Sequence, residues 1–278
     1  MSRELERVKL VLVDIQNSNR EALVLAAGRG SVEDLKNLLL SGFEINAANT
    51  EGYTPLMMAA VNNRSEAVSF LLDQGADLTL KNQAAETAVK MACYQDAVGA
   101  LLVLLNKITE KDYLITALRE VLFTAAMSDS VKIIQMLLDG KIDPNTRGLE
   151  QETPLMWTVY GNSLRTARLL LNHGANPNLE DSHGGTALTR AASSKFIELT
   201  RVLVDAGADL NKRETKTGRT ALTWAVACNR KEISEFLLSK GANPSVVDNE
   251  KNSALKLAEK NASPEIQKMI REALSQYM

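Results

Sequence analysis

The chain has 278 residues, of which 45% are hydrophobic, 24% are charged and only 4% are aromatic, and its formal net charge is -2. A core with so few aromatics must consist of Leu, Ala, Val and Ile, which favours helices over a β-sandwich. The near-neutral charge excludes a general electrostatic attraction to nucleic acid or to an anionic membrane. No apolar run reaches the roughly 18 residues that a membrane-spanning helix requires.

The first twenty residues predict a helix that caps the rest of the chain. Apolar residues share one face of a helix over residues 3–17, and charged residues occupy its other faces. The apolar positions are Leu5, Val8, Leu12 and Ile15. Because charges interrupt the apolar part, this segment does not match a secretory signal peptide. We therefore expect residues 1–20 to form an N-terminal capping helix.

The chain then repeats with a period of 33 residues, with a single step of 34. Similar segments begin at residues 21, 54, 87, 120, 153, 186, 220 and 253, and they read EALVLAA, TPLMMAA, TAVKMAC, EVLFTAA, TPLMWTV, TALTRAA, TALTWAV and SALKLAE. The small residues at their sixth and seventh places allow a helix to approach its neighbours closely. In most repeats a second helix follows and ends at a turn such as HGANPN, where glycine takes the left-handed conformation that helix C-termini often need.

This pattern resembles the ankyrin-repeat family, over residues 21–278 in eight repeats. The resemblance implies an all-α fold, an ankyrin-repeat solenoid of helix-turn-helix units with short β-hairpin fingers. One such unit cannot bury its apolar face alone, so neighbouring repeats must stack. The resemblance further implies that the first helix of each repeat lines a concave groove and that the second helix packs outside it. The His of the family's TPLH segment is missing from every repeat, so its usual hydrogen bonds between repeats are expected to be absent.

The third repeat is degenerate. Where a finger is expected after Leu105, Thr109 and Asp112 resemble a helix N-cap, and apolar residues then recur at helical spacing. We expect a lengthened helix to replace this finger, which would interrupt the groove between repeats three and four. The alternative is an ordinary loop with some helical content.

The last repeat predicts a C-terminal cap. Pro264 begins a final helix whose apolar residues share one face, and charged residues occupy the other face. The apolar positions are Ile266, Met269, Ile270 and Leu274. A cap of this kind covers the end of a stack of repeats while facing water on its other side.

Catalytic and metal-binding patterns are not found in the sequence. His173 and His183 have no Cys or carboxylate neighbours at metal-ligand spacing, and no phosphate-binding glycine motif occurs. Cys93 falls in the row of small core residues, and Cys228 has no His in its repeat that could activate it. We therefore expect no enzyme activity, no cofactor and no metal. Two cysteines far apart in the sequence favour a reducing compartment, so we expect a cytoplasmic protein.

A row of variable residues is expected to face the groove. Trp157, Arg190 and Trp224 occupy the same place in three consecutive repeats, and the chain has only these two tryptophans. Trp, Tyr and Arg often dominate binding energy at protein interfaces. The predicted partner-binding residues are Trp157, Tyr160, Arg190, Trp224, Arg219, Arg213, Tyr94, Tyr53 and Met58. The alternative is that both tryptophans fill gaps between repeats, with Arg190 stacked between them as an internal cation–π contact.

The predicted function is protein binding without catalysis. We expect an adaptor, scaffold or inhibitor that binds a protein partner in its concave groove as a monomer, without nucleic acid or membrane. Arg190, Arg213 and Arg219 would suit an acidic component of that partner, although the basic run around Arg213 also fits a solvated loop. An alternative is a bacterial ankyrin-repeat effector that acts on a host protein in the host cytoplasm. An enzyme or a nucleic-acid binder is disfavoured.

Overall fold

The computed structural model describes residues 20–277. The capping helix predicted over residues 3–17 therefore lies outside the described residues. By its internal contacts the chain divides into two compact units, Met1–Ala125 and Ala126–Met278. We call them the first and the second compact unit.

Paired helices make up the first compact unit. Residues 20–29 are helical and precede α2 (Val32–Leu40), α3 (Pro55–Val61), α4 (Ser65–Asp73), α5 (Ala88–Tyr94) and α6 (Val98–Asn106). Helix α3 packs on α4 of the same repeat and on α5 of the next, and α4 packs on α2 and α6. Each helix from α3 to α6 thus has a partner within its repeat and another in the neighbouring repeat.

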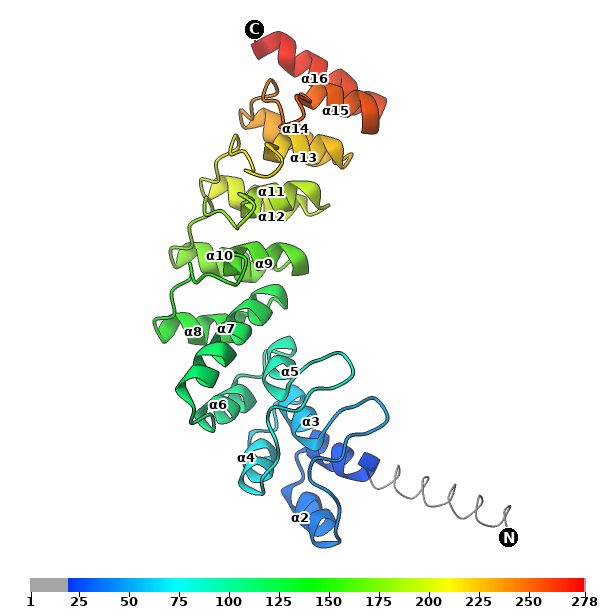
Figure 1. Ribbon diagram of the computed structural model, residues 1–278, viewed down its shortest axis with the longest axis vertical. Coiled ribbons are helices and arrows are strands. Elements are labelled where there is room, and N and C mark those ends of the chain that lie inside the picture. The colour runs from blue at the N-terminus through cyan, green and yellow to red at the C-terminus, as the bar shows by residue number, and fades with distance from the viewer. Residues whose placement is uncertain (1–19, 278) are drawn as a thin grey trace, which may run out of the picture. The chain divides into compact units, whose positions relative to one another are not determined.

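The second compact unit continues this arrangement in two parallel series of helices (Figure 1). An inner series contains α9 (Pro154–Gly161), α11 (Ala187–Ser193), α13 (Ala221–Ala227) and α15 (Ala254–Asn261). An outer series contains α8 (Val131–Asp139), α10 (Leu164–Asn172), α12 (Ile197–Asp205), α14 (Lys231–Ser239) and α16 (Pro264–Tyr277). Within each series consecutive helices contact one another. The predicted all-α fold of stacked helix pairs is confirmed.

Inner helices begin where a hydroxyl can cap them. The side chains of Thr54, Thr87, Thr153, Thr186, Thr220 and Ser253 each accept the N–H of the residue three places later. In α11 the cap is reciprocal, because the backbone N–H of Thr186 donates to Oγ1 of Thr189 over 2.9 Å. Thr223 does the same for Thr220 over 2.8 Å. Thr189 and Thr223 occupy the fourth place of their repeats, where the family has the missing His. Their hydroxyls bond to the capping threonine of the same repeat, so these polar contacts stay within one repeat.

The fingers are tight turns rather than strands. A backbone hydrogen bond joins the two ends of each finger, such as Asp181 N–H to the carbonyl of Gly185 over 2.9 Å. Equivalent bonds of 2.8 to 3.0 Å close the turns that begin at Asn49, Asn82, Gly148, Glu214 and Asp248. Across residues 20–277 the only β-bridge joins Val247 and Ser253. The fingers are present, but they are too short to form a regular strand ladder.

Helix α7 occupies the place where the third repeat would otherwise have a finger. It runs over 17 residues, Lys111–Met127, so the predicted lengthened helix is confirmed. Ala117, Val121 and Ala125 are buried at helical spacing, and every residue from Val121 to Ala126 is buried. The division into two compact units falls inside this same helix. That the groove is interrupted here stays a prediction.

Asparagine side chains join neighbouring repeats at the end of the outer helices. In the second compact unit Asn178 Oδ1 accepts the N–H of Asp209 over 2.7 Å, and its Nδ2 donates to the carbonyl of Gly207 over 3.0 Å. Asn46, Asn145 and Asn211 accept a backbone N–H of the next repeat in the same way. The amide suits this position because it offers both a donor and an acceptor.

We expect Asn178→Ala to lower the free energy of unfolding by about 1 to 3 kcal/mol, because two hydrogen bonds between repeats are lost. Urea denaturation followed by circular dichroism measures this. Asn172→Ala is the matched control, since Asn172 is exposed at the end of α10 and its side chain makes no hydrogen bond among the described residues. Equal stability of the two variants would contradict the role of Asn178.

Candidate partner-binding surface

Two side-chain clusters lie on the inner helices of the second compact unit. In the first cluster, α9 contributes Trp157 and Tyr160, and α11 contributes Arg190. The ring of Tyr160 meets that of Trp157 edge-on, with centroids 5.6 Å apart and planes at 70°. Arg190 Cζ lies 5.2 Å from the centroid of the Tyr160 ring, and Nη1 donates to the Tyr160 hydroxyl. Tyr160 nevertheless remains 58% exposed.

A finger carboxylate holds Arg190 from the other side. Arg190 Nη2 lies 2.5 Å from Asp181 Oδ2, and the side chain of Asp181 is only 5% exposed. The second oxygen, Asp181 Oδ1, accepts the N–H groups of His183 and Gly185 and so closes the finger turn. Burial lowers the pKa of Arg190, and the negative charges of Glu152 and Glu214 oppose this effect. One carboxylate therefore fixes both the finger and the arginine.

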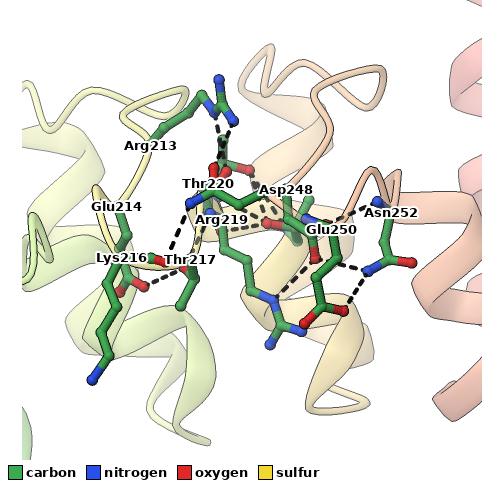
Figure 2. A network of polar contacts seen from close by, with 12 residues as sticks. Arg213, Glu214, Lys216, Thr217, Arg219, Thr220, Asp248, Glu250 and Asn252 are labelled. Atoms are coloured by element: carbon green, nitrogen blue, oxygen red, sulfur yellow. Dashed lines mark hydrogen bonds and ion pairs between the residues drawn. The ribbon is translucent and has the colours of Figure 1, made fainter.

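The second cluster lies two repeats further along, and its arginine, Arg219, comes from the finger before α13 rather than from an inner helix. Figure 2 shows Arg219 and Asp248 of this cluster. Arg219 Cζ lies 4.6 Å from the centroid of the Trp224 ring, and Arg219 Nε lies 3.5 Å from Asp248 Oδ2. The Asp248 side chain is 2% exposed, and its Oδ1 accepts the N–H groups of Glu250 and Asn252. Although burial raises the pKa of Asp248, hydrogen bonds from Asn252, Glu250 and Arg219 hold this pKa below its ordinary value.

These contacts differ from the alternative in which Arg190 stacks between Trp157 and Trp224. Arg190 stacks on Tyr160, whereas Trp224 is stacked by Arg219, so the structure shows two separate cation–π pairs. Both arginines already donate to buried carboxylates, and each positive charge is therefore neutralised within the chain. Arg213 is exposed, and its Nε donates to the carbonyl of Gly218 over 3.1 Å, which stiffens the longest finger.

The remaining predicted residues, Tyr53, Met58 and Tyr94, belong to the first compact unit and are all half-buried. Tyr53 forms the base of a finger, and its N–H donates to Oδ1 of Asn49 over 2.9 Å. Met58 lies on α3, and Tyr94 ends α5. Burial, followed by the nearby carboxylate of Glu86, raises the pKa of Tyr94. Part of each of these three side chains is therefore buried within the first compact unit.

Sequence reasoning missed the finger carboxylates Asp181 and Asp248. A signal was present, because Asn49, Asn82, Asp181 and Asp248 all stand five residues before the residue that caps an inner helix. Asp and Asn at such a place are explained by turn formation alone. Only the folded chain shows that the second oxygen of each aspartate reaches an arginine.

Cys93 lies on helix α5, and His173 is the C-cap residue of helix α10. Burial raises the pKa of the Cys93 thiol to about 12, so it is protonated at neutral pH. His173 Nδ1 lies 2.9 Å from the carbonyl of Leu169 in its own helix. Between residues 20 and 277 no group of three or more His, Cys, Asp or Glu side chains could hold a metal ion. None of the helices in this range is long and apolar enough to cross a bilayer.

Comparison with known proteins identifies the family. Models described as "Ankyrin repeats (3 copies)" match residues 2–82, 23–117 and 122–214, and a model described as "Ankyrin repeats (many copies)" matches residues 197–238. The chain therefore belongs to the ankyrin-repeat family. Ankyrin repeats are in general protein–protein interaction modules.

Among solved structures, the crystal structure of the human ASB11 ankyrin repeat domain superposes with a TM-score of 0.63 at 23% sequence identity. The match covers 80% of this chain and 98% of that one, and it shows a shared fold. No curated protein sequence matches the chain.

We expect Asp248→Asn to lower the free energy of unfolding by about 1 to 2 kcal/mol at pH 7, because the turn survives while the charged contact with Arg219 is lost. The folded-state pKa of Asp248 is depressed. The advantage of the wild type is therefore complete above the ordinary carboxyl pKa of about 3.9 and disappears as pH falls through the lower folded value.

Urea denaturation at pH 7, 5 and 3 measures this difference. Asp209→Asn is the control, because Asp209 closes a turn in the same way but makes no ion pair among the described residues. A difference for Asp248→Asn that is unchanged at pH 3 would rule out the charge as its cause.

Proposed function

We propose that the inner-helix surface of the second compact unit, centred on Trp157, Tyr160 and Trp224, binds a protein partner. The chain would then act without catalysis, as a monomeric adaptor, scaffold or inhibitor. The observation that carries this proposal is Tyr160, a 58% exposed aromatic ring that Trp157 and Arg190 hold in one orientation. Nothing in the repeat pattern requires a large aromatic residue at this place.

An exposed ring that is already oriented is well suited to binding. A partner that covers Tyr160 removes apolar surface from water without having to order a mobile side chain first. Trp157 and Trp224 are half-buried, so part of each indole remains available to the same partner. Aromatic residues of this kind are the ones that most often dominate interface energies.

The charges of this surface favour a partner that is mainly apolar at its centre. Arg190 and Arg219 are paired with buried carboxylates, so they support the aromatic rings rather than present unpaired charge. Arg213 is the exposed arginine of the predicted set and would meet an acidic group at the edge of the contact. Tyr53, Met58 and Tyr94 form a separate candidate contact region on the first compact unit.

We expect Tyr160→Ala and Trp224→Ala each to weaken partner binding by about 2 kcal/mol or more. The partner is first captured from lysate and identified as the protein retained by the wild type and lost by the double variant. Its affinity for each purified single variant is then measured by isothermal titration calorimetry. Thermal unfolding of the same samples separates a binding defect from a folding defect.

Leu102→Ala serves as the control, since Leu102 is also a partly exposed apolar residue but lies on α6. Variants that fold normally and bind the purified partner as tightly as the wild type would refute this surface. Loss of folding without a separate binding defect would assign the aromatic residues to packing between repeats.

A further inference from the structure

Backbone hydrogen bonds join the fingers of the second compact unit to one another. The N–H of Ser182 donates to the carbonyl of Glu150 over 2.8 Å, and that of Lys216 donates to His183 over 3.1 Å. In the next step Asn249 N–H donates to the carbonyl of Thr217 over 2.9 Å. The fingers that begin at Asp181 and Glu214 thus each donate to the preceding finger and accept from the following one. We call this series of contacts the finger ladder.

The finger ladder begins at the finger Gly148–Glu152. Leu149 stands where Ser182, Lys216 and Asn249 stand in the later fingers, four residues before the residue that caps the next inner helix. Its N–H has no acceptor among the described residues. No finger precedes it at the repeat spacing, because the chain there forms the helix α7. The first donor of the ladder is therefore unpaired.

The side chain at this edge is also unusual. Leu149 is 90% exposed at the tip of its finger. The equivalent residues of the later fingers, Ser182, Lys216 and Asn249, are all polar or charged. An unpaired backbone donor beside an exposed apolar side chain is the combination that allows an added segment to extend a hydrogen-bonded edge.

The existing contacts of the finger ladder indicate which backbone conformation such a segment needs. The residues that follow the three accepting carbonyls, Gln151, Gly184 and Gly218, all take the left-handed conformation, with φ of 60°, 77° and 70°. A Cβ on Gly184 would lie 2.3 Å from the backbone nitrogen of Thr215, and one on Gly218 would lie 2.7 Å from that of Asn249. The acceptor is therefore a carbonyl followed by a residue in the left-handed conformation. Glycine adopts this conformation most readily, although Gln151 shows that a residue with a Cβ can also take this place.

We propose that the finger Gly148–Glu152 is a second interaction site, which binds a glycine-containing turn of a partner protein by extending the finger ladder. A carbonyl directly before the glycine accepts the Leu149 N–H, and the bound turn covers part of the exposed Leu149 side chain. This site uses the finger tips rather than the inner-helix aromatics, so it does not depend on the function proposed above.

The probe is a cyclic peptide that copies the finger Asp181–Thr186, Asp-Ser-His-Gly-Gly-Thr, added to the full-length ¹⁵N-labelled chain. Saturable binding should move the Leu149 amide proton downfield, while the amides of Ser182, Lys216 and Asn249, which are already bonded, should change little. In the control peptide the first glycine is replaced by valine. Valine strongly disfavours the left-handed conformation that this place requires, so the control peptide should not hold the turn and should give a much smaller shift.

A proline substitution isolates the hydrogen bond. Leu149 is the second residue of a turn closed by Gln151 N–H and the carbonyl of Gly148 over 3.2 Å, a place where proline is favoured. Leu149→Pro therefore keeps the turn and removes only the N–H and the leucine side chain. It should weaken peptide binding, followed at the Glu150 amide, by about tenfold or more. Leu149→Ala keeps the N–H and should retain measurable binding.

Three results would overturn the proposal. The first is a Leu149 amide that does not respond to millimolar peptide, and the second is equal peptide binding by Leu149→Pro and the wild type. The third is a concentration-dependent dimer, seen by sedimentation without peptide and abolished in Leu149→Pro, which would make a second copy of the chain the occupant. Tyr160→Ala should leave the peptide response unchanged, so failure of the aromatic surface and failure of this edge are distinguishable.

Discussion

A repeat of this chain buries its apolar face only against its neighbours, and the other features of each compact unit depend on that stacking. Alanines such as Ala191 and Ala225 are fully buried in the inner helices, because larger side chains would hold consecutive helices apart. The close spacing in turn brings Asn178 within hydrogen-bond reach of the next repeat and brings one finger within reach of another. Residues of local turns thereby form hydrogen bonds between neighbouring repeats.

The candidate binding surface rests on the same stacking. Asp181 lies in a finger and Tyr160 on the inner helix of the preceding repeat, and Arg190 contacts both. The arginine is thus fixed by two repeats at once, and Tyr160 is held in place although more than half of it faces solvent. An exposed aromatic residue with little freedom is a suitable anchor for a partner, since its ordering costs little on binding.

The degenerate third repeat has a consequence beyond its own fold. Helix α7 supplies the buried residues that the stack needs, but it provides no finger. The finger that begins at Gly148 is consequently the first of its series, with an unpaired Leu149 N–H. The departure from the repeat thus leaves this finger without a preceding finger at the repeat spacing that could accept its N–H.

The sequence by itself determined the repeat, the helix starts and the lengthened helix over Lys111–Met127, because these depend on local spacing, capping residues and apolar periodicity. It also placed Trp157, Arg190 and Trp224 at equivalent positions of three repeats. Only the tertiary structure decided that Arg190 pairs with Tyr160 and Asp181, and Arg219 with Trp224 and Asp248. Such pairings depend on how far a long side chain reaches across two repeats, and a one-dimensional pattern does not contain this distance.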